Sequence, residues 1–409
     1  MRDTAVARGR RCAATLLLLT VYGACGQTDR GAGVAVETLE TGRVVVRHPD
    51  PGSATTLRLV EVLSIGAIEG TGPDVFGNVG SLAVGRNGVV YVGDRIAAEV
   101  RAFTPDGEFL RVMARRGSGP GEIPPSVFPF NLLWQEPNRL WIGAPPTLMS
   151  LDSLGHVGEA RYALGGIFVW TGRADTLDGI YSTLRSPLGM EPSMETLRIS
   201  VRKLRVLGDS LVSPAGELFI GFEENRVERT VTRGGATGHI MGSLPMRSET
   251  VWDVDPSGDI WLAQTGSYRL HRVTLAGDTI RTVELARAPE PLSAPERDSI
   301  ARNTTAFSAA ELPTHKPLIR HLRVGRNGWL WVRRRASVPS EDSWDVFDRC
   351  GRYLGSAAPP VPLDVSPWLP VGASGILGVT RGAFDVEYVV HLRLERNDGQ
   401  PVTSGDCTF

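Results

Sequence analysis

The stretch that decides the fold is residues 82–94, LAVGRNGVVYVGD, which recurs at 251–263 as VWDVDPSGDIWLA and at 322–332 as LRVGRNGWLWV. Each copy holds an apolar strand, a turn that ends in glycine, and a second strand with an aromatic residue at its centre. Asn-Gly and Ser-Gly turns tolerate the positive φ that tight hairpins require. Because the same unit returns along the chain, the sequence indicates a repeat architecture.

Each unit continues into a second hairpin, at residues 100–112, 270–283 and 344–354. The spacing from Gly88 to Gly107 equals that from Gly258 to Gly277, and the third unit has a longer middle loop. Four strands per unit, with an aromatic residue in the second strand, are typical of a β-propeller blade.

Three weaker copies occur at residues 131–155, 167–221 and 367–394. The last copy has only three strands, and an open sheet edge would leave backbone groups unpaired. The lone strand at 57–63, LRLVEVL, can supply the missing fourth strand. We therefore expect an all-β, six-bladed β-propeller of four-stranded antiparallel blades over residues 56–396, closed by strand 57–63. Seven blades are the alternative, because residues 207–249 have room for one more.

One segment breaks the pattern, at residues 287–320. Ser293 and Glu296 have the spacing of a capping box, and Pro295 suits an early helical position. A short helix inserted between two blades is the prediction for this segment. After the propeller, residues 397–409 are expected to form a C-terminal tail.

The first 25 residues are typical of a secretory signal. Arginines precede a short apolar run, and small residues then lead to Cys25. This stretch resembles a bacterial lipobox, which predicts that Cys25 is acylated and becomes the mature N-terminus; the alternative is an ordinary cleaved signal. Residues 26–55 are polar and turn-rich, so we expect a flexible tether. The protein would then be periplasmic or on the outer cell surface, anchored to a membrane by lipid alone.

The composition limits the partners. The chain has 409 residues with 44 Lys and Arg against 45 Asp and Glu, a formal charge of -1. This balance supplies no field that would attract nucleic acid, so no nucleic-acid partner is expected. Hydrophobic residues make up 42% of the chain, an ordinary share that is enough for a packed core. We expect the protein to be a monomer.

Catalytic motifs are lacking in the sequence. The seven histidines are scattered, none at the spacing of a HExxH site, and neither a phosphate-binding loop nor a GxSxG elbow occurs. We therefore expect no cofactor and no catalytic set. Four arginines at predicted strand ends are the candidates for receiving an anionic ligand: Arg115, Arg116, Arg333 and Arg335. The alternative for all four is a salt-bridged or solvated side chain.

Two further cysteines are predicted to pair. Cys350 lies in the outer hairpin turn of the blade that starts at residue 322, and Cys407 follows the closing blade. These blades are neighbours in the ring, and an exported protein meets an oxidising compartment. A disulfide between Cys350 and Cys407 would fix the C-terminal tail to the ring; two free thiols are the alternative.

With these motifs identified, the chain resembles the bacterial six-bladed propellers related to NHL repeats. The resemblance is strongest over residues 81–122, and it extends to 312–332 and, more weakly, over 57–396. It implies a binding function, for a protein or a small-molecule ligand, without catalysis. The alternative is a metal-dependent propeller hydrolase or lyase with its site at the central channel, because a propeller lyase that resembles this group holds zinc through histidines from separate blades.

Overall fold

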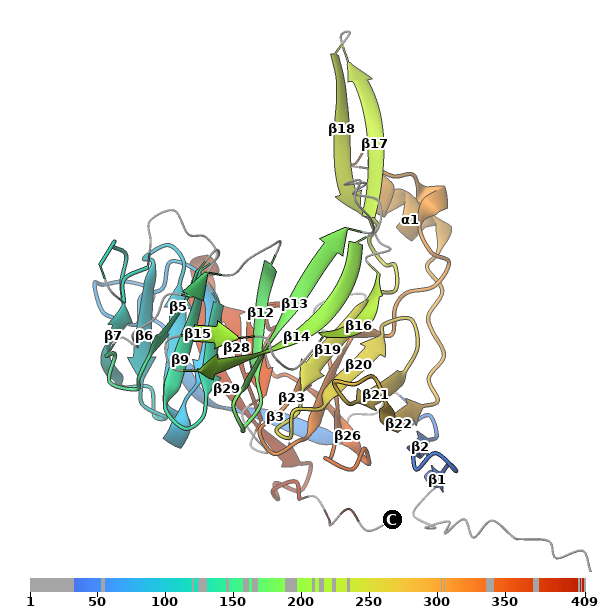
Figure 1. Ribbon diagram of the computed structural model, residues 1–409, viewed down its shortest axis with the longest axis horizontal. Coiled ribbons are helices and arrows are strands. Elements are labelled where there is room, and N and C mark those ends of the chain that lie inside the picture. The colour runs from blue at the N-terminus through green and yellow to red at the C-terminus, as the bar shows by residue number, and fades with distance from the viewer. Residues whose placement is uncertain are drawn as a thin grey trace, which may run out of the picture.

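The computed structural model describes residues 33–52, 56–119, 121–123, 131–144, 147–156, 162–163, 168–187, 197–207, 210–212, 217–222, 226–233, 236–302, 304, 306–335, 342–370, 375–403, 405 and 407. Over these residues the protein is nearly all β (Figure 1). The predicted signal segment, Cys25 and its acylation lie outside the described residues. None of the helices in the described part has the length and apolar character of a transmembrane span.

The first two sheets are antiparallel and four-stranded. The first contains β4 (Val79–Val84), β5 (Val90–Asp94), β6 (Glu99–Phe103) and β7 (Phe109–Ala114). The second contains β8 (Asn131–Gln135), β9 (Arg139–Ala144), β10 (Thr147–Leu151) and β11 (Tyr162–Ala163). The turn from β4 to β5 is the short 3-10 segment η1 (Arg86–Gly88), in which Asn87 has φ 61° and Gly88 has φ 79°. This Asn-Gly pair therefore adopts the left-handed conformation that the sequence predicts.

The third sheet is less regular. It contains β12 (Phe168–Ala174), β13 (Gly179–Pro187), β14 (Leu197–Leu207), β15 (Ser210–Val212) and β16 (Glu217–Phe222). Both β15 and β16 pair with β14, at different positions along it. The hairpin of β17 (Arg226–Arg233) and β18 (Ala236–Ser243) follows and projects away from the sheets (Figure 1). Within the described residues these two strands pair only with each other.

The fourth sheet has six strands, because the N-terminal segment joins it. Its antiparallel part contains β19 (Thr250–Val254), β20 (Ile260–Gln264), β21 (Arg269–Val273) and β22 (Thr279–Leu285). The strand β2 (Val44–His48) pairs in parallel with β22, and β1 (Ala35–Thr38) pairs with β2. The prediction of a flexible tether over 26–55 is therefore wrong for residues 35–48. Burial of Val45, Val46 and His48 supplies the free energy that orders this segment.

The last sheet has eight strands. It begins with β23 (Ile319–Val324), β24 (Leu330–Arg334), β25 (Trp344–Phe347) and β26 (Tyr353–Ala358), and it ends with β27 (Trp368–Pro370), β28 (Gly375–Arg381) and β29 (Glu387–Arg396). Between these two groups lies β3 (Leu57–Ile65). It pairs antiparallel with β29 along its length and makes a short parallel contact with β26. The N-terminal strand thus completes a four-stranded set with β27, β28 and β29.

The segment between the fourth and last sheets carries the helix α1 (Ala294–Ala301) and the 3-10 turn η2 (Ala309–Glu311). The capping box that Ser293 and Glu296 predict is present, since the Ser293 side chain accepts from the Glu296 backbone and Glu296 accepts from the Ser293 backbone. Leu244, Leu292 and Leu312 form a small core beneath the helix. A further 3-10 turn, η4 (Ala383–Asp385), joins β28 to β29.

The core lies between consecutive sheets. Tyr91 of the first sheet stacks on Trp134 of the second, with ring centroids 5.5 Å apart. Similar buried clusters join the third sheet to the fourth, the fourth to β23–β26, and β23–β26 to β27–β29. Another joins β28 and β29 to the first sheet. Sheets that pack face to face around their first strands are the arrangement of a β-propeller.

The predicted aromatic residue in the second strand is buried in five of the sheets. These residues are Tyr91, Trp141, Tyr181, Trp261 and Trp331. The first strands of the sheets lie innermost and contact one another in the order β4, β8, β12, β19, β23, β27 and β4 again. The first strands therefore surround a common axis, where the candidate site lies.

Candidate functional site

A cavity of about 540 Å³ lies at the axis of the protein. Every one of the strands β4, β8, β12, β19, β23 and β27 contributes residues to its wall. Ligand pockets of small molecules commonly measure about 300–1,000 Å³. The cavity is therefore of the size that a small molecule needs.

Strand register places one residue from each inner strand at the same level. In each sheet this residue lies opposite the central residue of the second strand, as Ala83 lies opposite Tyr91 and Arg323 opposite Trp331. The complete set, which we call the central ring, is Ala83, Leu133, Arg173, Asp253, Arg323 and Leu369. All of these residues line the cavity. The central ring thus carries two positive charges and one negative charge.

Arg173 and Asp253 neutralise each other. Arg173 Nε lies 2.7 Å from Asp253 Oδ1, and the same carboxylate accepts from the backbone N of Val254 and of Val324, each at 2.9 Å. Burial raises the pKa of Asp253, while Arg173 and these two amide donors oppose that shift. The pair joins β12, β19 and β23, so its contacts are structural.

Arg326 is also engaged. It lies in the turn after β23, and its guanidinium donates to the backbone oxygens of Val84 and Gly85. Its Nη1 lies 3.2 Å from Oε1 of Glu136. Arg326 therefore ties the turn after β23 to the turn after β4, and Glu136 balances its charge.

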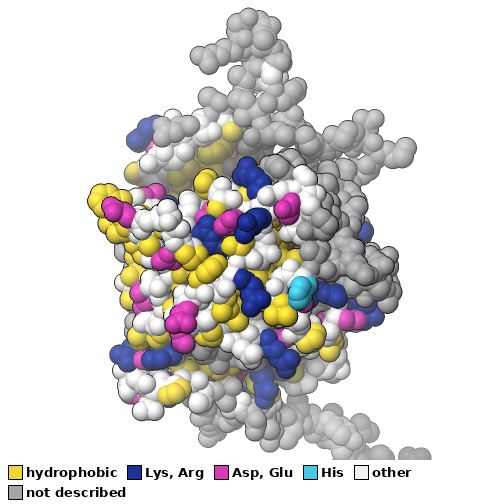
Figure 2. All heavy atoms as spheres, turned by 90° about the vertical axis from the view of Figure 1, so that its left-hand side faces the viewer, with side chains coloured by type: hydrophobic (Ala, Val, Ile, Leu, Met, Phe, Trp, Pro, Cys, Tyr) yellow, Lys and Arg dark blue, Asp and Glu magenta, His cyan; other side chains and the backbone are white. Residues whose placement is uncertain are grey.

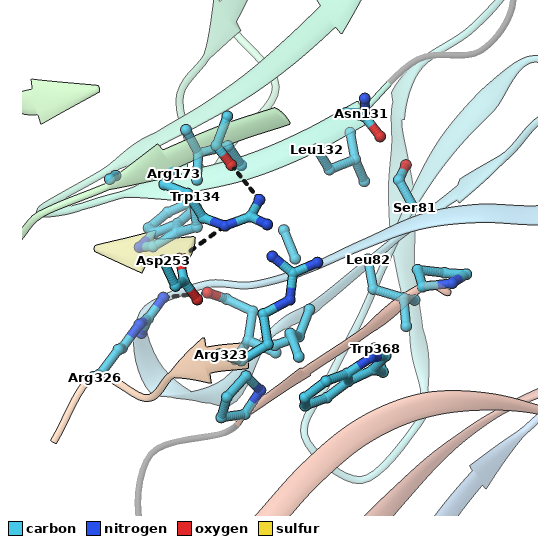
Figure 3. Close-up of a pocket in the computed structure, with 18 of the residues that line it drawn as sticks. Ser81, Leu82, Asn131, Leu132, Trp134, Arg173, Asp253, Arg323, Arg326 and Trp368 are labelled. Carbon is cyan, nitrogen blue, oxygen red and sulfur yellow. Dashed lines mark hydrogen bonds and ion pairs between the residues drawn. The ribbon is translucent and has the colours of Figure 1, made fainter. Parts of the chain in front are cut away.

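Arg323 differs from these arginines. Its guanidinium carbon lies 5.9 Å from the centroid of the Trp368 ring, and its Nε is buried without a hydrogen-bond partner. Among the described residues, no carboxylate pairs with it and no carbonyl accepts from it. Figure 3 shows the guanidinium reaching into the cavity between Arg173 and Trp368. Arg323 is therefore an uncommitted cation in the cavity wall.

The neighbouring level of the wall is polar. Ser81 is buried, and its hydroxyl lacks a partner among the described residues. Asn131 lines the same part of the cavity (Figure 3). His321 lies two residues before Arg323, with its ring centroid 6.5 Å from that of Trp368. Burial, together with the positive charges of Arg333, Arg320, Arg335 and Arg173, lowers the pKa of His321 to about 4. Positive charge therefore gathers around β23.

The four arginines that the sequence singles out do not line the cavity. Arg115 and Arg116 are exposed and follow the outer strand β7. Arg333 is fully buried, forms an ion pair with Asp342, and donates to the backbone oxygens of Leu363, Asp364 and Val365. A ligand cannot reach Arg333, so its assignment to ligand binding is corrected. Arg335 is partly buried, and burial lowers its pKa.

Arg323 was missed because each copy of the repeat was compared as a pattern of apolar and turn residues. When the copies are aligned on their turn glycines, Ala83, Asp253 and Arg323 occupy the same position. A charged residue at a position that is otherwise small or apolar is the signal that identifies it.

The two predicted cysteine partners lie together. Cys350 and Cys407 form a disulfide, with Cα atoms 5.5 Å apart. Cys350 is fully buried in the turn between β25 and β26, where its backbone oxygen accepts from Arg281. The ring of His48 contacts the next residue, with Nε2 2.8 Å from the oxygen of Gly351. The N-terminal strand and the C-terminal tail are thus both attached to this turn.

Figure 2 shows that basic and acidic side chains both occur among apolar ones on the face that it presents. Within the described residues, no three His, Cys, Asp or Glu side chains come together as a metal site would require. Arg323 therefore remains the candidate for binding a charged ligand, because it lines the cavity and no described residue pairs with it.

No known family model matches the chain, and no curated protein matches it. Solved structures resemble it in chain path. One is from Bacteroides fragilis and is named as an exported protein, with 9% identity, a TM-score of 0.48, and coverage of 86% of this chain and 100% of that one. Virginiamycin B lyase from Staphylococcus aureus has 11% identity, a TM-score of 0.41, and coverage of 83% and 99%. Regucalcin from Agrobacterium tumefaciens has 11% identity, a TM-score of 0.31, and coverage of 88% and 99%.

Proposed function

We propose that the chain is an exported, lipid-anchored, six-bladed β-propeller that binds a small-molecule ligand in its central cavity without catalysis. The observation that carries the proposal is the cavity itself. Six inner strands contribute to one space of about 540 Å³, and Arg323 enters it with no hydrogen-bond or ion-pair partner among the described residues. An uncompensated charged donor in a partly buried site favours occupancy by a ligand that accepts from it.

Six blades are supported by the contacts of the inner strands, which follow one another in a cycle from β4 to β27 and back to β4. In this proposal β3 is the fourth strand of the last blade, next to β29. The hairpin of β17 and β18 is then an insertion rather than a seventh blade, since its strands pair with each other. Closure by both ends of the chain removes the open edge that the last copy would otherwise have.

Export is supported by residues 1–25, which have an arginine-rich start, an apolar run and Cys25 at their end. The Cys350–Cys407 disulfide fits an oxidising compartment. We propose that Cys25 carries the lipid, and that the monomer attaches to a membrane through that lipid alone. Metabolic labelling with a fatty-acid probe tests this, because equal labelling of wild type and Cys25→Ala would contradict it.

Ligand binding can be tested with a cavity-blocking variant. Leu133 belongs to the central ring, so Leu133→Trp should fill part of the cavity. Leu177 is exposed and lies outside the cavity, so Leu177→Trp is the matched control. The three proteins would be screened by thermal shift against a panel of sugars, amino acids, nucleosides, amines, and aliphatic and aromatic acids.

We expect at least one compound to raise the melting temperature of wild type and of Leu177→Trp, and to lose this effect in Leu133→Trp. If every stabilising compound acts equally on Leu133→Trp, the cavity is not the binding site. If no compound stabilises the wild type, the proposal of a small-molecule ligand fails.

A further inference from the structure

We infer that the ligand of the central cavity is a carboxylate with an aromatic or similarly flat apolar body, and that Arg323 binds its carboxylate. This inference rests on the proposed function and adds the chemical class of the ligand. It comes from the charges of the cavity wall and from the side chains that surround Arg323.

The cavity wall has one positive charge that no described residue balances. Arg173 is balanced by Asp253, and Arg326 is balanced by Glu136. Arg323 has no counter-ion among the described residues, so the wall keeps one positive charge. Asp253 does not repel an anion strongly, because an arginine and two backbone amides already neutralise its carboxylate. A ligand with one negative charge would complete the wall.

A carboxylate suits the geometry of this cation. A guanidinium presents its N–H groups as a planar fork that matches the two oxygens of a carboxylate. The Nε of Arg323 is buried in the wall, whereas the end of the guanidinium reaches into the cavity, so a ligand meets the two terminal nitrogens. A carboxylate that accepts from both terminal nitrogens would supply the acceptors that the described residues do not. Hydrogen bonds to charged groups are stronger than neutral ones when water is excluded.

The remaining wall favours a flat apolar body. Trp134 and Trp368 lie on different sides of Arg323, and Leu82 and Leu132 also line the space (Figure 3). Aromatic walls hold flat ligands through large contact areas and preferred ring geometries. Ser81 adds one buried hydroxyl that has no partner in the part of the chain that the structure describes, and this hydroxyl can donate to or accept from a polar substituent on the body. The wall therefore combines one fixed cation with apolar surfaces and one weaker polar contact.

Three probes share an indole ring and differ in the charge of their side chain, so they separate the effect of charge on affinity from that of the aromatic body. Indole-3-acetate is an anion, indole-3-acetamide is its neutral equivalent, and tryptamine is a cation. Their affinities for the purified full chain would be measured by isothermal titration calorimetry. We expect indole-3-acetate to bind about tenfold or more tightly than indole-3-acetamide, and tryptamine to bind most weakly.

Two arginine variants assign the effect. Arg323→Gln should bring the affinity for the acid down to that for the amide, and Arg323→Lys should restore part of the difference because it keeps the charge but not the fork. Arg115→Gln is the matched control, since Arg115 is exposed and outside the cavity. Near-ultraviolet circular dichroism would verify that each variant keeps the wild-type packing.

Equal binding of acid and amide by the wild type would overturn the carboxylate assignment, while the proposed function would stand if Leu133→Trp still abolished both. A preference for the acid that survives in Arg323→Gln would overturn the role of Arg323. If the panel of compounds yields only neutral or cationic ligands that depend on the open cavity, the inference fails and the proposed function holds. Loss of all panel binding would instead reject the proposed function.

Discussion

Two arginines on neighbouring strands of the same sheet have opposite environments. Arg333 on β24 is fully buried, and an acid and three backbone oxygens engage it. Arg323 on β23 faces the cavity, with an aromatic ring beside it and no acceptor among the described residues. The comparison teaches that the partners of an arginine decide its role in a repeat protein. An arginine that other parts of the chain engage stabilises the fold, and one without such partners can bind a ligand.

The largest expected effect comes from removing the engaged arginine. Arg333→Met should lower the free energy of unfolding by about 3 to 5 kcal/mol, because Asp342 and the backbone oxygens of 363–365 lose their donor inside the protein. Arg323→Met should change it by less than about 1 kcal/mol, because no partner is left unsatisfied. Urea denaturation of the two variants measures both values. Equal losses would show that the two arginines do not differ as described.

Removing the disulfide tests whether the stability of the outer part of the sheet can be changed without changing ligand binding in the cavity. Cys350 follows β25, the strand that pairs with β24, whereas the cavity lies at the inner edge of the sheet. Cys407→Ser opens a loop of 57 residues and should lower the free energy of unfolding by up to about 4 kcal/mol, by the chain-entropy relation. The affinity for a cavity ligand should stay the same.

Urea denaturation and calorimetry measure these two quantities, and wild type under reducing conditions is the control. Peptide mapping of the unreduced protein should recover Cys350 and Cys407 in one linked fragment. Two unlinked fragments would contradict the bond.

The pKa of His321 responds to Arg333, because His321 lies on β23 with Arg333 opposite it across the strand pair. Its pKa is lowered from 6.5 to about 4 by burial and by the surrounding arginines. Below pH 6.5 the unfolded chain binds a proton that the folded protein refuses, so stability should fall between pH 6.5 and pH 4 by at most about 3 kcal/mol.

In His321→Gln this part of the loss should disappear. The loss that comes from His48, His271 and His391 should remain, since burial lowers the pKa of those groups as well. Denaturation in a pH series measures the difference between the two proteins. Parallel pH profiles would mean that His321 is protonated as readily in the folded state as in the unfolded state.

The smallest effect extends the comparison from arginines to hydroxyls. Ser81 has no partner among the described residues, so Ser81→Ala should change the free energy of unfolding by less than about 0.5 kcal/mol. Ser257 donates to Asp255 at 2.7 Å and accepts from Arg272 at 2.8 Å, so Ser257→Ala should cost about 1 kcal/mol. Urea denaturation of both variants at one pH tests the order. A larger loss for Ser81→Ala would reveal a contact of that hydroxyl.

The repeat units could be predicted from sequence because their signals are local. Turn glycines such as Gly88 and Gly258, and central aromatic residues such as Trp261, follow from hairpin chemistry within a few residues. The same holds for the capping box at Ser293. These features depend on residues that are close together in the sequence, so the sequence alone is enough to predict them.

The candidate site and the N-terminal strands could not be predicted in this way. The position of Arg323 at the axis depends on five other strands, and the partners of Arg333 lie in a loop about thirty residues later. β2 was mistaken for a tether because its partner β22 is far along the chain and because turn residues surround its short apolar run. Contacts of this kind are decided by which strands meet, and single-sequence patterns do not contain that information.

The pairing of β3 with β29 also bears on the order of synthesis. β3 leaves the ribosome before the strands from β4 to β28 exist, whereas its antiparallel partner β29 is made after all of them. Throughout elongation β3 therefore presents unpaired backbone groups and the apolar side chains of Leu57, Leu59 and Ile65, which are buried in the finished protein. The last sheet can be completed only after β29 has been made. A chain shortened after β28 would keep most of its sheets and yet carry a permanently open edge, which makes it a substrate for aggregation or for proteases.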